Sequence, residues 1–138
     1  MMKTLNDTLE HCATHSGFPT YLYARMGEAN VPMDEVTQFP AIVRAFNETI
    51  YETKIKNTRR RKSTLYFCDA LGEAEPNTSY SVAPIIDKIE MRAFAFVDNM
   101  RHNNIEIEIQ SATPFVGRFD ALVAGIKMEL TMTYSMCR

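Results

Sequence analysis

The last third of the chain joins a segment with helical periodicity to two segments with strand periodicity. Residues 105–109 and 125–134 alternate apolar and polar side chains, which places one set on each face of a strand. An amphipathic helix packed on an antiparallel sheet satisfies all three segments, so the sequence predicts an α+β fold. Within residues 81–102, the apolar side chains recur at steps of three and four and mark one helix face: Val82, Ile86, Ile89, Ala93, Val97 and Met100.

The N-terminal part of the chain predicts a second, shorter helix and another strand. Residues 4–14 carry apolar side chains on one side, and Thr4 can act as the N-cap. Residues 20–25 are rich in strand-forming side chains. The segment 26–37, with its glycine, proline and acidic residues, is typical of a surface loop.

The middle of the chain predicts a long hairpin over about 41–69. Residues 41–53 fit a helix or a strand, and their β-branched content and the preceding Pro40 favour a strand, with Ile42, Phe46 and Ile50 on one face. Residues 63–69 are apolar almost throughout, which indicates a strand in the middle of a sheet. The basic segment 54–62 then forms the tip of this hairpin.

These segments together predict one domain over residues 1–138. We expect an antiparallel sheet of four to six strands, packed by one main amphipathic helix plus a short N-terminal helix. The residues expected to form the core are Leu65, Phe67, Ile86, Ile89, Ala93, Val97, Ile107, Leu130 and Met132.

Composition narrows the class of protein. The 17 acidic and 15 basic residues give a net charge of −2, so overall charge does not favour nucleic acid, and the apolar runs are too short to cross a membrane. The first residues lack the apolar block of a secretory signal, and three cysteines without motif spacing are expected to be reduced thiols. The nine methionines suit a core or, alternatively, a contact between subunits such as one involving Met128 and Met132.

No set of residues predicts an active site. His11 and His15 are one helical turn apart, a spacing that can hold a metal, but no third ligand has a recognisable spacing, and two exposed histidines are the simpler interpretation. Glu106 and Glu108 take the outward positions of a strand, where carboxylates are normally solvated. Neither a phosphate-binding glycine loop nor a nucleophile on a tight turn is found. The sequence therefore predicts a protein that is not an enzyme, with no catalytic residues, no cofactor and no metal.

The strongest local feature is a basic segment. Without its six bases the chain keeps nine bases and 17 acids, a net charge of −8, so charge is strongly polarised. Such a segment can neutralise phosphates, dock on an acidic protein surface, or only keep a hairpin tip solvated. The candidate contact residues for a partner or a nucleic acid are Lys54, Lys56, Arg59, Arg60, Arg61 and Lys62.

The order of these features resembles small neck or tail-completion (tail-terminator-like) proteins of tailed bacteriophages and prophages, particularly of Bacteroides-type bacteria. The resemblance covers about residues 39–134. It begins with Phe39-Pro40, continues through the charged hairpin and the main helix, and is most recognisable at Phe119-Asp120 and Ala124-Gly125 before the last strand. Residues 1–38 have no counterpart in this pattern.

The resemblance implies a virion structural protein with no catalytic residues. Such a subunit self-associates into a ring at the head–tail junction or at the top of the tail tube, next to other neck or tail proteins and around the passing DNA. It is assembled in the cytoplasm of the bacterial host. The alternatives are a nucleic-acid-binding α+β module that uses the basic segment 54–62, and a small ligand-binding domain with a pocket between helix and sheet.

Overall fold

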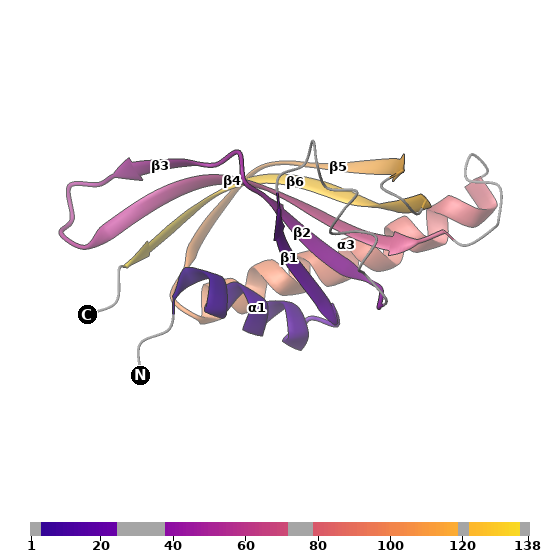
Figure 1. The fold of residues 1–138 in the computed structure, drawn as a ribbon, viewed down its shortest axis with the longest axis horizontal. Helices are drawn as coiled ribbons and strands as arrows, with labels where there is room; N and C mark the ends of the chain where they lie inside the picture. Colours follow the sequence, from indigo (N-terminus) through magenta and orange to yellow (C-terminus); the bar gives the residue numbers. More distant parts are fainter. Residues whose placement is uncertain (1–3, 25–37, 72–78, 119–121, 136–138) are drawn as a thin grey trace.

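The computed structural model describes residues 4–24, 38–71, 79–118 and 122–135. Within these ranges the chain forms two helices and a sheet of six strands, mostly antiparallel, which is the predicted α+β fold (Figure 1). The predicted loop 26–37, the pair Phe119-Asp120 and Cys137 lie outside the described residues. In chain order the elements are α1 (Leu5–His15), β1 (Thr20–Ala24), β2 (Ala41–Ala45), β3 (Thr49–Glu52), β4 (Thr58–Ala70), α3 (Ser79–His102), β5 (Glu106–Arg118) and β6 (Leu122–Ser135).

The strand order across the sheet is β1-β2-β4-β6-β5, and β3 pairs with β4 on the same side as β2. β4 is therefore central, as its apolar residues 63–69 predicted. The described pairs are antiparallel except β1 with β2, which run parallel from Thr20 beside Ala41 to Ala24 beside Ala45. Parallel neighbours need a long connection, which residues 25–40 provide, and no local pattern in the sequence distinguishes this pairing from an antiparallel one.

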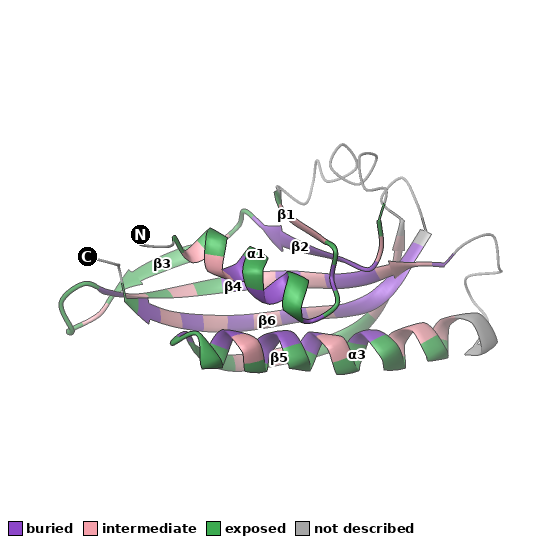
Figure 2. Cartoon of the chain, turned by 90° about the horizontal axis from the view of Figure 1, so that it is seen from below, coloured by how far each residue is buried: buried purple, intermediate pink, exposed green. Residues whose placement is uncertain are grey.

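Both helices cover the same side of the sheet, which we call the helix face; the opposite side is the open face. α3 packs along β4, β5 and β6, and α1 packs against α3 and β1. The sheet is longer than the helices: β3 and the adjoining half of β4 project beyond them (Figures 1 and 2). Side chains on the projecting part are therefore more exposed than those at the centre of the sheet.

The main core lies between the helices and the helix face. Seven of the nine predicted core residues are buried there, and Ile86 and Ile107 are partly buried at its margin, so the core prediction is confirmed. The ring of Phe67 contacts those of Phe18 and Phe96, with ring centres 5.5 Å apart in both pairs. Met128 and Met132 are also fully buried, so they belong to the core and not to a contact between subunits.

The ends of both helices follow local signals in the sequence. At the start of α1 the Thr4 hydroxyl accepts a hydrogen bond from the Asp7 amide at 3.1 Å, and the Asp7 carboxylate accepts one from the Thr4 amide at 3.3 Å. α3 begins at Ser79, two residues before the predicted start. It ends as predicted, with Asn104 in the left-handed region at a φ of 66°.

The segment 41–53 is two strands, and the predicted continuous strand is wrong. β2 is buried along its whole length, β3 is exposed along its whole length, and residues 46–48 separate them. Ile42 is in the core as expected, whereas Phe46 and Ile50 are 49% and 53% exposed. The break exists because Glu48 turns toward Arg44, as described below.

The hairpin turn is also shorter than the sequence predicted. β4 starts at Thr58, so Arg59 to Lys62 are strand residues paired with β3 on one side and with β6 on the other. The turn comprises residues 53–57, in which Asn57 adopts a left-handed φ of 63°. Charge alone suggested a solvated tip, but in a strand only alternate side chains need to face solvent, and long basic side chains can lie along the sheet.

β4 and β6 approach each other closely at Gly125, and a substitution there tests this packing. A Cβ atom at this position would lie 1.8 Å from the carbonyl oxygen of Phe67, so Gly125→Ala must push two central strands apart. We expect the free energy of unfolding, measured by urea denaturation, to fall by about 3 kcal/mol. Gly117→Ala is the matched control, because its Cβ would meet only the Phe115 ring at 3.5 Å. Equal stability of the two variants would contradict this packing.

Candidate functional site

The six predicted contact residues do not form one patch. Lys54 and Lys56 lie in the exposed turn, and the other four lie on β4, where successive side chains alternate between faces. Arg61 pairs with the buried Met132, so Arg59 and Arg61 are on the helix face. The other two of the four, Arg60 and Lys62, are exposed on the open face. We call the four residues Arg59, Arg60, Arg61 and Lys62 the basic strand.

A buried carboxylate lies behind the basic strand. The side chain of Glu48 is only 3% exposed, yet four side chains donate hydrogen bonds to it. Arg44 donates from Nε at 2.7 Å and from Nη2 at 3.0 Å, and Arg61 donates from Nη1 at 3.0 Å. The hydroxyls of Ser63 and Tyr23 each donate at 2.5 Å. Because its carboxylate oxygens already accept these hydrogen bonds, Glu48 has a structural role and is not available as a general base.

Arg44 is the largest buried side chain of the sheet and links it to α1. It is 1% exposed, and beyond Glu48 it donates to the Tyr21 hydroxyl at 3.2 Å and to the side chain of Asn6 at 3.4 Å. Its guanidinium group also lies over the Tyr23 ring, 3.9 Å from the ring centre. The buried charge is thus matched on several sides, as burial of an ion requires.

The pKa values of these groups follow from burial and hydrogen bonding. Burial alone would raise the pKa of Glu48, but hydrogen bonds from Arg44, Ser63 and Tyr23 outweigh it and keep that pKa below its ordinary value. Burial alone would lower the pKa of Arg44, and its hydrogen bond to Glu48 outweighs that effect, so the pKa is raised. Burial raises the pKa of Tyr21 and Tyr23. Arg44 and Glu48 are therefore both charged at neutral pH.

The sequence reasoning missed this network, although one signal was present. Ala41-Ile-Val-Arg-Ala45 places a single charge in an otherwise apolar run, and a buried arginine needs a carboxylate partner. Glu48 is the nearest acidic residue in the chain. The predicted continuous strand would have kept the two side chains apart, so the pair could not be recognised from that prediction.

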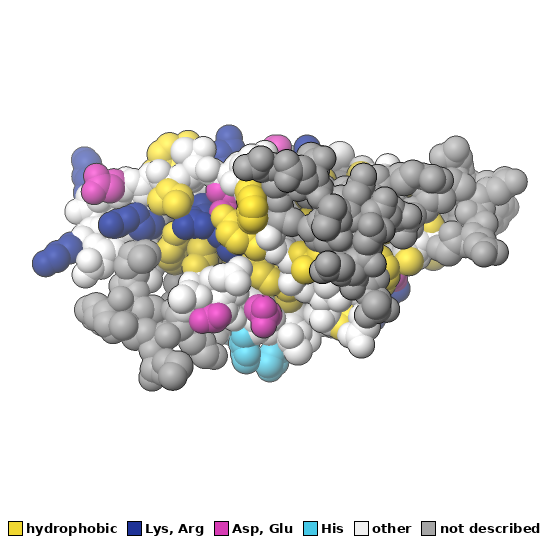
Figure 3. Space-filling view, viewed as in Figure 1, with side chains coloured by type: hydrophobic (Ala, Val, Ile, Leu, Met, Phe, Trp, Pro, Cys, Tyr) yellow, Lys and Arg dark blue, Asp and Glu magenta, His cyan; other side chains and the backbone are white. Residues whose placement is uncertain are grey.

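Exposed apolar side chains surround the network. Tyr23, Phe46 and Ile50, which we call the apolar patch, are 39%, 49% and 53% exposed. The Tyr23 and Phe46 rings pack edge to face with centres 4.7 Å apart, and Ile50 pairs with Arg61 across the strands. Figure 3 shows basic and hydrophobic side chains side by side at the projecting end of the molecule. This is the combination that protein interfaces favour, with an apolar centre and arginine beside it.

The open face is polar at the projecting end, and its side chains there are ordered in rows, whereas around β2 the same face carries a second buried apolar cluster. One row crosses four strands as Tyr51, Arg60, Thr133 and Glu106. The next row contains Thr49, Lys62, Thr131 and Glu108. In both rows a base on β4 and an acid on the outer strand β5 are separated by a threonine of β6. The face thus has a basic side and an acidic side.

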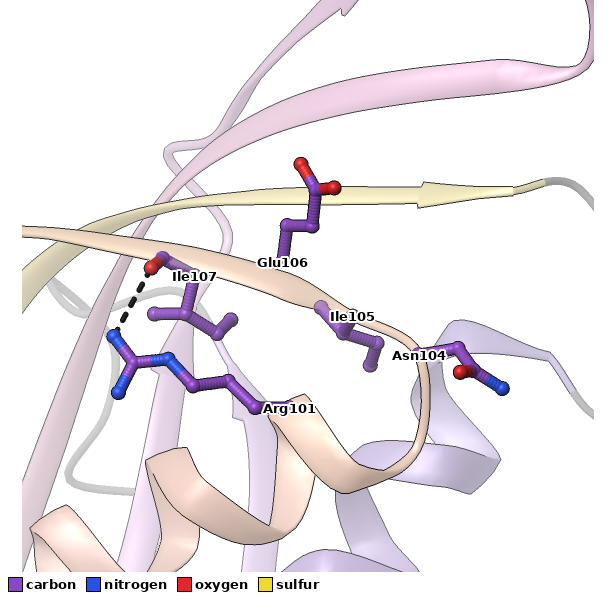
Figure 4. A pocket seen from close by; sticks show the side chains of 5 residues that line it. All are labelled: Arg101, Asn104, Ile105, Glu106 and Ile107. Carbon is purple, nitrogen blue, oxygen red and sulfur yellow. Dashed lines mark hydrogen bonds between the residues drawn. The ribbon is translucent and has the colours of Figure 1, made fainter.

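Two open hollows lie at the C-terminal end of α3. The larger, about 550 Å³, is lined by Arg101, Asn104, Ile105, Glu106 and Ile107. Figure 4 shows Arg101 directed at the backbone of β5, where it donates to the carbonyl oxygen of Ile107 at 3.1 Å, while Glu106 points away from it. The second, about 390 Å³, lies between the start of α1 and the end of β6. Neither hollow brings together the ionisable groups that a reaction needs.

The other candidates from the sequence lie away from this surface. His11 and His15 are on α1 with ring centres 4.1 Å apart, and the described residues bring no third His, Cys, Asp or Glu close enough to complete a metal site. Cys12 and Cys68 are buried, and burial raises the pKa of Cys68 to about 12, so its thiol is unreactive at neutral pH. Glu108 is exposed, as the outward strand position predicted.

Replacing Glu48 with alanine tests the buried network. It leaves Arg44 buried without its main acceptor, so we expect the free energy of unfolding in urea to fall by about 3–5 kcal/mol. Glu52→Ala, which removes an exposed carboxylate from the same segment, should change it by less than about 0.5 kcal/mol.

The same contact predicts the pH dependence of stability. The pKa of Glu48 is lower in the folded chain than its ordinary value of 4.5, so the ionised form stabilises the fold above that pH. This stabilisation is lost as the pH falls through the folded-state pKa. Unfolding of Glu48→Gln should therefore depend less on acid than unfolding of the wild type; identical acid limbs would show that Glu48 is not held ionised.

Comparison with known proteins gives no family for the chain. No protein-family model matches it, and no match is found among the curated proteins. None of the helices in the described ranges is apolar over a length that would traverse a bilayer. A function for the basic strand and the apolar patch is therefore inferred from the geometry and chemistry of their own residues.

Proposed function

We propose that the protein is a non-enzymatic structural subunit that self-associates into a ring, as a tail-completion or neck component at the head–tail junction of a tailed bacteriophage. One observation carries the self-association: the apolar patch stays exposed around the break between β2 and β3, where the sheet begins to project beyond the helices. Exposed apolar surface next to arginine is a common mark of a protein-binding site. The phage context is carried by the resemblance of residues 39–134.

The rigid network behind the patch supports a binding role. Tyr23 is fixed by its hydrogen bond to Glu48, and Arg61 is bonded to the same carboxylate. Side chains that are already ordered lose little conformational entropy when a partner binds. The side chains of Tyr23 and Arg61 are therefore ordered before a partner binds, whereas the side chains of a solvated turn would not be held by such hydrogen bonds.

The distribution of charge supports a ring. On the open face, Arg60 and Lys62 of β4 form a basic side, and Glu106 and Glu108 of β5 form an acidic side. Different, complementary surfaces on one subunit lead to head-to-tail contacts, and these close into a ring when the rotation between copies allows it. The partners in this proposal are further copies of the chain, other neck or tail proteins, and DNA passing through the ring, all within the virion.

Mass and shape in solution test this proposal. We expect sedimentation velocity to show a concentration-dependent oligomer and negative-stain imaging to show rings. Phe46→Ser should weaken association, because it removes an exposed ring of the apolar patch. Met91→Ser is the matched control: Met91 is 76% exposed, but on α3 and away from the patch. A strictly monomeric wild-type chain at high concentration would contradict the proposal.

A second candidate function is the binding of single-stranded nucleic acid on the open face. Tyr51 lies beside Arg60, and the ammonium group of Lys127 lies 5.9 Å from the centre of the Tyr66 ring, so aromatic and basic side chains share this face. Such a mixture suits stacked bases and their phosphates. The sequence placed Tyr66 only in the strand next to the basic segment; the shared face follows from strand register.

Fluorescence anisotropy with an oligonucleotide tests this alternative. If it is right, the wild type binds with an affinity that falls steeply with salt. Each phosphate contact contributes about −0.7 to the slope of the logarithm of the binding constant against the logarithm of the salt concentration. Arg60→Glu combined with Lys62→Glu should then abolish binding. The control is Asp98→Arg, which adds positive charge at an exposed position of α3. No binding by the wild type at low salt would exclude this function.

A further inference from the structure

The two outer strands β3 and β5 lie on opposite sides of the β4–β6 pair. Within the described residues each pairs with one strand only, β3 with β4 and β5 with β6, so each has an outer edge. β3 runs antiparallel to β4, β4 to β6, and β6 to β5. β3 and β5 therefore run in opposite directions, and copies placed side by side in the same orientation bring β5 of one beside β3 of the next as an antiparallel pair.

The backbone groups on these edges match. The carbonyl of Ile107 accepts from the Arg101 side chain, so it points outward from β5 and not toward β6. In an antiparallel sheet the direction of these groups alternates from strand to strand along one row. The row of Ile107 continues through Met132 and Arg61 to Ile50, so the amide and carbonyl of Ile50 point outward from β3.

The side chains on the two edges also match. On the helix face, exposed Ile50 would meet Ile107 of the neighbouring copy and continue its apolar row. On the open face, Glu106 and Glu108 of β5 would lie two strands, roughly 10 Å, from Arg60 and Lys62 of the neighbour. Both edges are short, because a register shift after Ile109 limits regular pairing on β5 to residues 106–109 and β3 is four residues long; three residue pairs overlap when Ile107 lies opposite Ile50.

We propose that these two edges join copies of the chain: residues 106–108 of one copy pair with residues 49–51 of the next and extend the sheet from subunit to subunit. This inference rests on the proposed self-association and names its contact. In this register Ile107 pairs with Ile50, Glu106 with Tyr51, and Glu108 with Thr49. Arg101, whose side chain is 48% exposed, then shares the Ile107 carbonyl with the arriving amide of Ile50, since a carbonyl oxygen can accept two hydrogen bonds.

A disulfide trap tests the register. Thr49 and Glu108 are both exposed on the open face. In the proposed contact, Thr49 of one copy and Glu108 of the next form a pair without mutual hydrogen bonds, in which the Cα atoms are about 4.5 Å apart and a disulfide fits. Within one chain the two positions are separated by three strand spacings, roughly 14 Å, so a bond between them must join two copies. The variant is Thr49→Cys/Glu108→Cys, made with Cys137→Ser so that only the buried thiols remain beside the new pair.

Mild oxidation should convert this variant into a ladder of covalent oligomers on a denaturing gel. The control, Thr49→Cys/Thr113→Cys in the same background, has the same number of exposed thiols on the same two strands, but out of register, and should remain mostly monomeric. A ladder from both variants, or from neither, would overturn the proposed pairing.

A second measurement separates this inference from the proposed function. Ile50→Lys places a charge against the neighbour's Ile107 and should raise the dissociation constant of self-association by about tenfold or more. Ile55→Lys is the control, because Ile55 is 70% exposed in the turn and outside the pairing. If the wild type and both variants assemble equally, this contact is wrong while the ring stands. If the wild type does not associate, both proposals fail.

Discussion

The ion pair between Arg44 and Glu48 is the contact on which the shape of this surface depends. Burying a charge costs several kcal/mol unless a partner compensates it, so Arg44 can occupy the interior only with a carboxylate beside it. In a continuous strand, the Cα atoms of residues 44 and 48 would be about 13 Å apart, and side chains that stand perpendicular to the sheet would not meet over that spacing. The observed distance of 2.7 Å between Arg44 Nε and a carboxylate oxygen of Glu48 is reached because the chain turns between them. The break between β2 and β3 is therefore a consequence of the pair.

This break divides the sheet into two parts with different environments. Before it, β2 is buried on both sides; after it, β3 is exposed throughout and borders only β4 within the described residues. Phe46 and Ile50, which a regular strand would have turned toward the core with Ile42, are exposed instead. One buried pair thus stabilises the centre of the fold and creates the apolar patch and the outer edge through which we propose that copies associate.

The sequence predicted a segment's structure correctly where one face of that segment is buried along its whole length. α3 and β6 each present one face to the core along their length, so periodicity predicted their type and their buried residues. The segment 41–53 crosses from the core to the surface, and its pattern fitted two structures. The basic segment was recognised by its charge, but its division into Arg59 and Arg61 on one face and Arg60 and Lys62 on the other required the strand register.

The sequence by itself determined the α+β class, the main helix, the central strand and most of the core, because each depends on the spacing of apolar side chains along the chain. Only the tertiary structure decided the parallel pairing of β1, the burial of Glu48, and the rows that join bases on β4 to acids on β5. These features depend on which strands become neighbours and in what register. Contacts between residues far apart in sequence determine that, and no local pattern encodes them.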